Sequence, residues 1–195
     1  MDKGKIIILN GTSSAGKSTL ARVLQDRVQE AFFVVMGDDY MEMLGRSKYV
    51  DICDKAYVQY NLVECYTAKA LSDMGMNLIM DTLFLKCDTE KEESVGLSEW
   101  VRLLHGYPVL FVHVSCPLEE LRRRERERGD REIGQGESQI SRLDPQDTYD
   151  IAVDNYVNTN EECADKIIEL LNDPEMFTAF KALWLQRTLS ESQRR

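Results

Sequence analysis

Short apolar runs alternate with amphipathic segments along most of the chain. Each run is nearly continuous in Ile, Val, Leu, Phe or Met, which is typical of strands buried on both faces of a parallel sheet. The segments between the runs carry apolar residues at helical spacing. This alternation predicts an α/β fold with three layers, α/β/α, around a central parallel sheet of about five strands. The predicted strands span residues 6–9, 32–36, 77–81, 109–114 and 151–154.

The predicted helices connect these strands and continue toward the end of the chain. They span residues 17–31, 40–44, 55–74, 97–105, 117–128 and 161–171, and a last one begins at Pro174. At 195 residues the chain is most simply one domain, residues 1–195. Within it we expect a lid at about residues 122–140 and a C-terminal helical extension at about 174–195. Trp184 in that extension is expected mainly to pack on the core.

The first predicted strand runs into a phosphate-binding loop. Residues 11–18 read G-x-x-x-x-G-K-S, between a strand and the start of a helix. Main-chain N–H groups of such a loop surround phosphates, Lys17 reaches the terminal phosphates, and the Ser18 hydroxyl binds Mg²⁺. The expected cofactors are therefore ATP and Mg²⁺. The expected nucleotide-binding residues here are Gly11, Thr12, Ser13, Ser14, Ala15, Gly16, Lys17, Ser18 and Thr19.

Aspartates follow two of the predicted strands, at the edge of the sheet where ligands bind in α/β folds. Asp38 and Asp39 follow the second strand, and Asp81 ends the third. A carboxylate facing a substrate hydroxyl can remove its proton, and Asp39 is the first candidate for this base, with Asp38 the second. The alternative is a pair that caps the helix beginning at Tyr40. Asp81 is a candidate for Mg²⁺ or substrate binding, with an ordinary loop aspartate as the alternative.

An arginine-rich segment follows the fourth strand. Its arginines are Arg122, Arg123, Arg124, Arg126, Arg128 and Arg131. Charges of alternating sign at helical spacing predict a solvated face with ion pairs from Glu120 to Arg124 and from Arg123 to Glu127. Arg124 and Arg128 share a face, and Arg131 follows a Gly-Asp break. These three arginines are expected to contact phosphates, with Arg128 and Arg131 closing over the transferred group and excluding water.

Composition excludes several other classes of protein. The net charge of −10 argues against non-specific binding to nucleic acid or an anionic membrane. No apolar run approaches the roughly 20 residues of a membrane span, and the N-terminus leaves no room for a signal peptide. The cysteines are scattered and the two histidines lack metal-ligand spacing, which argues against a zinc site or disulfide framework. A cytoplasmic protein is expected.

The chain resembles the chloramphenicol phosphotransferase family of P-loop kinases. The blocks that carry the resemblance are the phosphate loop, Gly37-x-Asp39, Asp81-x-x-Phe84-Leu85, and Arg124-Glu125-x-x-Arg128-Gly129-Asp130-Arg131-x-x-Gly134 with Tyr149-Asp150-x-x-Val153-Asp154. The resemblance implies that Asp39 is the general base and that Arg124, Arg128 and Arg131 belong to the lid. It also implies that Asp81 and Phe84 lie on the substrate or metal side of the cleft.

Together these features predict an ATP-dependent kinase that phosphorylates an alcohol group of a small molecule. The acceptor is chloramphenicol, with antibiotic resistance as the role, or another hydroxylated compound. One alternative is a nucleoside or nucleotide kinase, although the adenylate-kinase type of loop, G-x-P-G-x-G-K, is absent. Another alternative is a nucleotide-dependent regulatory protein without transfer. A small-molecule partner is expected, without nucleic acid or membrane, and a homo-oligomer contact remains open.

Overall fold

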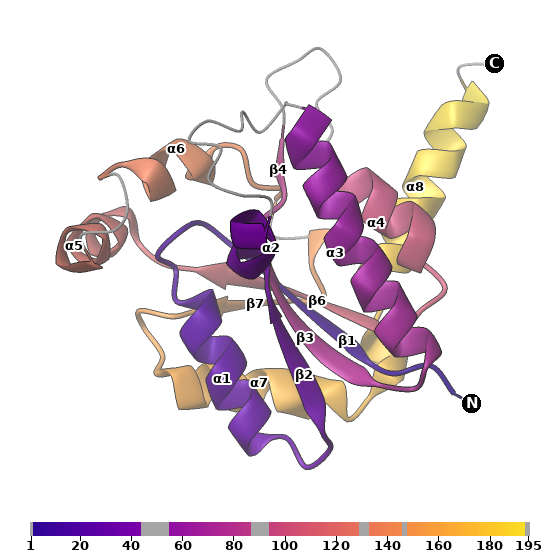
Figure 1. Cartoon of the computed structure of the whole chain (residues 1–195), viewed down its shortest axis with the longest axis horizontal. Coiled ribbons are helices and arrows are strands. Elements are labelled where there is room, and N and C mark those ends of the chain that lie inside the picture. Colours follow the sequence, from indigo (N-terminus) through magenta and orange to yellow (C-terminus); the bar gives the residue numbers. More distant parts are fainter. Residues whose placement is uncertain (1, 44–54, 87–93, 129–132, 146–147, 194–195) are drawn as a thin grey trace.

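The computed structural model describes residues 2–43, 55–86, 94–128, 133–145 and 148–193. Five parallel strands form its main sheet in the order β2-β3-β1-β6-β7, with β1 at the centre (Figure 1). The strands are β1 (Ile6–Asn10), β2 (Phe32–Met36), β3 (Asn77–Thr82), β6 (Val109–Ser115) and β7 (Ile151–Asp154). A separate antiparallel pair joins β4 (Leu85–Lys86) to β5 (Ser94–Val95). The predicted parallel sheet is therefore confirmed.

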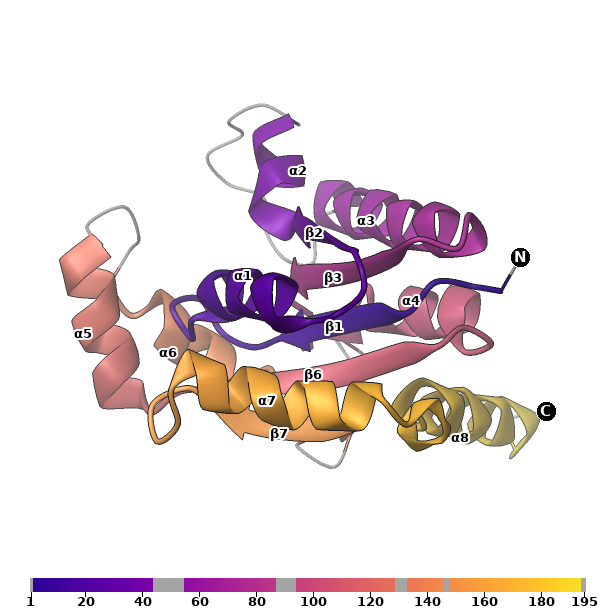
Figure 2. The ribbon, with the colours of Figure 1, turned by 90° about the horizontal axis from the view of Figure 1, so that it is seen from below.

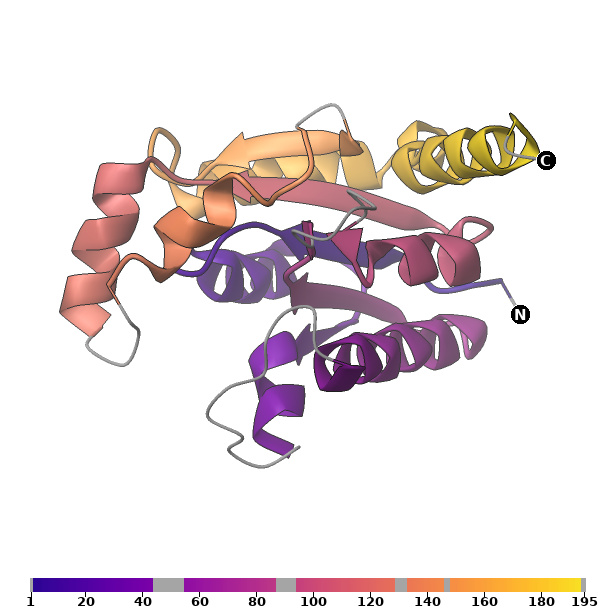
Figure 3. The ribbon, with the colours of Figure 1, turned by 90° about the horizontal axis from the view of Figure 1, so that it is seen from above.

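Helices cover both faces of this sheet because β1 and β3 are apolar on both sides (Figures 2 and 3). On one face, Ile7 and Leu9 pack with α1 (Lys17–Arg27) and α7 (Asn160–Leu171). On the other, Ile6 and Ile8 pack with three helices, which are α3 (Lys55–Asp73), α4 (Leu97–Leu104) and α8 (Ala179–Gln193). In α8, Trp184 packs against this second cluster and stacks on His105, as expected of a core-packing helix. A 3₁₀ turn, Pro174–Met176, precedes α8.

Three further helices lie beyond the carboxyl ends of the strands. They are α2 (Gly37–Met43), α5 (Leu118–Arg128) and α6 (Gln135–Ile140). Figure 1 shows them grouped at the edge of the sheet where β1 ends and α1 begins. Among the described helices, none is both long and apolar enough to cross a membrane. Helix α2 follows β2, whereas α5 and α6 both follow β6, so segments that come after two different strands lie near the phosphate loop.

Three helix boundaries differ clearly from those predicted, and one is the start of the last helix, which begins at Ala179 rather than at Pro174. Helix α1 ends at Arg27 rather than residue 31, because Val28 already has extended backbone angles. Helix α2 begins at Gly37, directly after β2, rather than at Tyr40. Asp38 and Asp39 consequently lie in the first helical turn instead of in a loop. That turn is the positive end of the helix dipole, where acidic residues are common.

Candidate active site

The phosphate loop connects β1 to α1 through two residues with positive φ. Ser14 has φ 63° and Gly16 has φ 95°. A side chain at Gly16 would also place its Cβ 2.1 Å from Nδ2 of Asn155, and one at Gly11 would lie 2.2 Å from the carbonyl oxygen of Val114. Only glycine therefore fits at either end of the loop without displacing the neighbouring strand or the residues after β7.

Arg124 holds this loop from outside. Its Nη1 donates to the carbonyl oxygens of Ser14 at 3.3 Å and Ala15 at 3.2 Å, and its Nη2 donates to that of Asn155 at 2.9 Å. The Nδ2 of Asn155 donates to Ala15 as well, at 2.9 Å. Glu120 accepts from Nε of Arg124 at 2.7 Å, which completes the predicted ion pair. The phosphate contact expected of Arg124 stays a prediction; in this structure its guanidinium donates to main-chain carbonyls of the loop.

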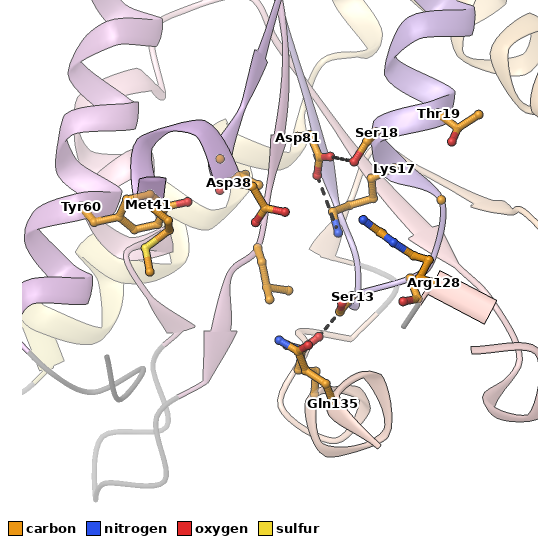
Figure 4. A pocket seen from close by; sticks show the side chains of 16 residues that line it. Ser13, Lys17, Ser18, Thr19, Asp38, Met41, Tyr60, Asp81, Arg128 and Gln135 are labelled. Atoms are coloured by element: carbon orange, nitrogen blue, oxygen red, sulfur yellow. Dashed lines mark hydrogen bonds and ion pairs between the residues drawn. The ribbon is translucent and has the colours of Figure 1, made fainter. Parts of the chain in front are cut away.

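Lys17 and Ser18 meet Asp81 across the ends of neighbouring strands (Figure 4). The hydroxyl of Ser18 donates to Oδ2 of Asp81 at 2.5 Å, and Nζ of Lys17 lies 3.7 Å from Oδ1 of the same carboxylate. Two oxygens bound side by side to one Mg²⁺ are about 2.9 Å apart, so this hydroxyl and carboxylate fit a shared ion. No group of three or more His, Cys, Asp or Glu in the described ranges could hold a metal. Such an ion would therefore also depend on phosphate oxygens.

A cavity of about 630 Å³ opens beside the loop, and Figure 4 shows its two walls. One wall carries Lys17, Ser18 and Arg128, and the other carries Asp38 and Tyr60. The remaining side chains that matter for its chemistry are Ser13, Met41, Asp81, Thr82, Leu83, Gln135 and Gln139. The cavity thus places a carboxylate from α2 opposite the lysine of the phosphate loop.

A second hollow, of about 530 Å³, lies on the other side of the loop. Asn155, Asn158 and Thr159, which lie between β7 and α7, line it together with Arg124. Four residues line both hollows, namely Ser14, Gly16, Thr19 and Arg128. The loop and Arg128 therefore lie between two adjoining spaces, an arrangement that suits an elongated ligand with its anionic middle over the loop.

The expected site residues fall into three groups. Asp81, Arg128 and six of the expected loop residues come together around the larger cavity, whereas Gly11, Thr12 and Ala15 do not line it; the six are Ser13, Ser14, Gly16, Lys17, Ser18 and Thr19. Asp38 and Asp39 are both exposed, but only Asp38 lines this cavity, and it points toward the centre in Figure 4. Phe84, expected to bind substrate, is 0% exposed in the core beside Trp100, so Leu83 takes its place in the wall. Arg131 lies outside the described residues.

Glu64 is a buried carboxylate behind the cavity that sequence reasoning missed. It lies on α3 with 0% exposure and accepts from Oγ1 of Thr82 at 2.9 Å. Burial raises its pKa to about 7, although hydrogen bonding to Tyr60 and Thr82 opposes the shift. The pattern on α3 offered no signal, because a lone glutamate in an amphipathic helix is normally solvated. His113 is also buried, which lowers its pKa, and its ring stacks on Tyr149.

Helix α6 is attached both to α5 and to the phosphate loop. The carboxylate of Glu125 accepts from the N–H groups of Gly134 and Gly136, each at 2.7 Å. The Oε1 of Gln139 accepts from the N–H of Ser13, also at 2.7 Å. The predicted pair of Arg123 with Glu127 is present on the solvent side of α5. The described part of the expected lid is therefore bonded to the loop in this structure.

Comparison with known proteins finds similarity to phosphotransferases and kinases. A family model described as "Chloramphenicol phosphotransferase-like protein" matches residues 4–172. A "Putative O-phosphotransferase" of Mycobacterium tuberculosis is 28% identical over 200 residues, covering 87% of this chain and 83% of that protein. An "Adenylyl-sulfate kinase" of Clostridium acetobutylicum is 26% identical over 177 residues, covering 87% and 84%.

Solved structures share the fold at low sequence identity. The APS kinase of Mycobacterium tuberculosis in complex with AMPPNP and APS has a TM-score of 0.66 and 17% identity, with 89% of this chain and 100% of that chain covered. A gluconokinase of Sinorhizobium meliloti has a TM-score of 0.58 and 14% identity, with 96% and 97% covered. These likenesses show the fold of a P-loop kinase.

Proposed function

The chain belongs to the chloramphenicol phosphotransferase-like family of P-loop kinases, and on that premise we propose that it transfers the γ-phosphoryl group of ATP to a hydroxyl of a small molecule. One observation carries the proposal. Asp38 lines the same cavity as Lys17 and the hydrogen-bonded pair of Ser18 and Asp81. An alcohol is a weak nucleophile until its proton is removed, and a carboxylate opposite a bound phosphate is suited to accept that proton.

We infer one orientation for ATP from the residues that line the two hollows. The main-chain N–H groups of the phosphate loop and of the start of α1 would hold the phosphates. The nucleoside would occupy the hollow lined by Asn155 and Thr159, and the γ-phosphate would face the larger cavity. Ser18 and Asp81 would hold Mg²⁺, which supplies charge neutralisation on the phosphates when it is bound. Lys17 and Arg128 would stabilise the negative charge that spreads over the transferred group.

The transfer itself needs one proton acceptor. The hydroxyl oxygen of the acceptor forms a bond to the γ-phosphorus as the bond from that phosphorus to the β,γ-bridging oxygen breaks. Asp38 takes the hydroxyl proton, and ADP leaves with the bridging oxygen. We assign this step to Asp38 rather than to Asp39 because only Asp38 lines the cavity, although the family resemblance implies Asp39. Paired substitutions distinguish the two residues.

The charges in the cavity favour an uncharged acceptor. Among the described lining residues the cationic side chains are Lys17 and Arg128, and both lie at the phosphate loop. The opposite wall offers Asp38, Met41 and Tyr60. A carboxylate with apolar and aromatic neighbours suits a neutral alcohol with an apolar body better than an anion. Chloramphenicol, or a hydroxylated compound like it, is therefore the first candidate, with antibiotic resistance as the corresponding role.

A nucleotide acceptor is the second candidate. The relative described as an adenylyl-sulfate kinase, at 26% identity, favours it. Against it stands the lack of a cationic side chain on the α2 wall of the described cavity. An anionic acceptor normally requires Arg or Lys at its binding site.

A direct screen tests the proposal. The protein is incubated with ATP and Mg²⁺ and with chloramphenicol, other hydroxylated compounds, nucleosides or adenylyl sulfate, and products are analysed by mass spectrometry. We expect addition of one phosphoryl group to chloramphenicol or another neutral alcohol, and no addition with the Lys17→Met variant. Phosphorylation of adenylyl sulfate alone would establish the second candidate. ATP hydrolysis without transfer to any compound, together with recovery of a stoichiometric protein partner, would favour a regulatory role.

A further inference from the structure

The contact between α6 and the phosphate loop centres on Gln139. Its side chain is only 8% exposed although it lines the larger cavity, and its Oε1 accepts from the Ser13 N–H at 2.7 Å. Gly136 on the same helix is buried, and a Cβ there would lie 3.1 Å from the carbonyl oxygen of Ser13. Helix α6 therefore lies directly against the third residue of the loop, with no room for a side chain between them.

The bond from Ser13 to Gln139 fixes an entire peptide unit. The carbonyl oxygen of the same unit belongs to Thr12, and it accepts from Nζ of Lys17 at 3.0 Å and from the N–H of Ala15 at 3.3 Å. In a planar trans peptide the N–H and C=O groups point in opposite directions. Holding the N–H on Gln139 consequently directs the carbonyl at Lys17. A reversed peptide would instead aim its N–H at the ammonium group, which is unfavourable.

We propose that Gln139 is a positioning residue that acts on Lys17 through the Thr12–Ser13 peptide. The inference rests on the proposed function only in that Lys17 acts on the phosphates of ATP. Gln139 fixes the direction of the Thr12 carbonyl. This carbonyl and that of Gly11, which accepts from Nζ of Lys17 at 2.9 Å, together form a cradle for the ammonium group. A cradle formed before the nucleotide arrives reduces the cost of ordering Lys17 on binding.

The position of Gln139 is itself set by α5. Glu125 is 1% exposed, and its two carboxylate oxygens accept from the N–H groups of Gly134 and Gly136 at the start of α6. A buried carboxylate with two charge-assisted bonds to backbone anchors the helix firmly. Helix α6 therefore presents Gln139 to the loop from a fixed base.

Nuclear magnetic resonance of the nucleotide-free protein tests the contact and its consequence separately. The Ser13 amide proton should resonate downfield in the wild type, and the Lys17 ammonium signal should be observable because its protons are held. Gln139→Leu should remove both features. Gln139→Glu retains an acceptor for the Ser13 N–H and should preserve them. Ser138→Ala, an exposed change on the same helix, is the matched control and should leave both signals unaltered.

Calorimetry with the ATP analogue AMPPNP measures the effect on nucleotide binding. Loss of the hydrogen bond in Gln139→Leu should raise the Kd about tenfold, with no change for Ser138→Ala. If the Ser13 amide proton resonates at the same position in Gln139→Leu as in the wild type, the hydrogen bond from Ser13 to Gln139 is not formed in solution. A shifted Ser13 amide with the Lys17 signal and the Kd unchanged would overturn the positioning role. None of these readouts needs an acceptor, so a failure to find an acceptor would count against the proposed function alone.

Discussion

The hydroxyl of Ser18 donates a 2.5 Å hydrogen bond to Asp81, a residue 63 positions further along the chain. The pairing of β1 with β3 brings them together, since Leu9 lies opposite Asp81 in the parallel register. In the proposed function this hydroxyl and carboxylate oxygen would supply two of the six ligands of Mg²⁺, and phosphates and water would supply the others. The bond therefore joins the start of α1, directly after the phosphate loop, to the carboxyl end of β3.

Substitutions of Ser18 or Asp81 should reduce the increase in nucleotide affinity that Mg²⁺ produces. Ser18→Ala removes an oxygen ligand and Asp81→Asn replaces a charged oxygen ligand by a neutral amide, so the gain in AMPPNP affinity on adding Mg²⁺ should fall about 10- to 100-fold. Calorimetry with Mg²⁺ and with EDTA measures that gain, and binding in EDTA should change little for Ser18→Ala. If both variants keep the full gain, the metal site lies elsewhere.

Arg124→Lys should weaken nucleotide binding because the phosphate loop loses part of its support. Lysine cannot reproduce the planar fork that holds the carbonyls of Ser14 and Asn155 together, so the loop loses its outer support. We expect the Kd for AMPPNP to rise about tenfold in equilibrium titrations. Arg126→Lys, the same change at an exposed position of α5, is the control. Equal affinities for the two variants would contradict the clamp.

Much of the fold was predictable because its signals are local. Each buried strand is a short apolar run, and the G-x-x-x-x-G-K-S spacing marks the junction from β1 to α1 by itself. The aspartates were placed near the correct edge for the same reason. Which of Asp38 and Asp39 lines the cavity was not predictable, because it depends on α2 beginning at Gly37, which places Asp38 in the cavity wall.

The rest of the site depends on contacts between distant parts of the chain. Gln139 lies 126 positions from Ser13, and in the sequence it is one more polar residue of a short helix. Arg124 has the charge of a phosphate ligand, and only its position beside the loop carbonyls reveals a clamp. Phe84 follows the motif that carries Asp81, yet its ring is directed into the core. No periodic pattern distinguishes these outcomes.

Removing the charge of Glu125 should destabilise α6. In Glu125→Gln one carboxylate oxygen becomes an NH₂ group facing a backbone N–H, at Gly134 or Gly136, so one buried donor loses its acceptor. The free energy of unfolding should fall by about 2 kcal/mol. Thermal unfolding measures the loss, and hydrogen exchange at residues 134 and 136 should accelerate. The exposed Glu119→Gln should change neither, and slow exchange retained in Glu125→Gln would refute the anchor.

The raised pKa of Glu64 predicts that the ionised carboxylate lowers the free energy of unfolding at high pH. Its folded-state pKa of about 7 exceeds the ordinary value of 4.5, so the folded protein binds this proton more tightly than the unfolded chain. The free energy of unfolding of the wild type should therefore fall by about 3 kcal/mol as pH rises from about 4.5 to 7, because the folded protein releases this proton less readily than the unfolded chain.

Glu64→Gln has no carboxylate to ionise, so its free energy of unfolding should not fall over this pH range. In metal-free buffer its Tm should exceed that of the wild type by several degrees at pH 8, and the difference should vanish near pH 4. The exposed Glu169→Gln on α7 serves as the control for loss of one negative charge. A constant difference between Glu64→Gln and wild type across this range would show that Glu64 does not titrate differently on folding.

The central claim is that a carboxylate of α2 removes the proton of an alcohol opposite ATP. The measurement that tests it most directly is the rate of phosphoryl transfer to the accepted alcohol by Asp38→Asn and Asp39→Asn, with AMPPNP affinity measured alongside. The account predicts that Asp38→Asn binds nucleotide normally and loses at least about 100-fold in kcat, whereas Asp39→Asn loses less than about tenfold. Wild-type turnover in Asp38→Asn would contradict that assignment, and wild-type turnover in both variants would contradict the mechanism.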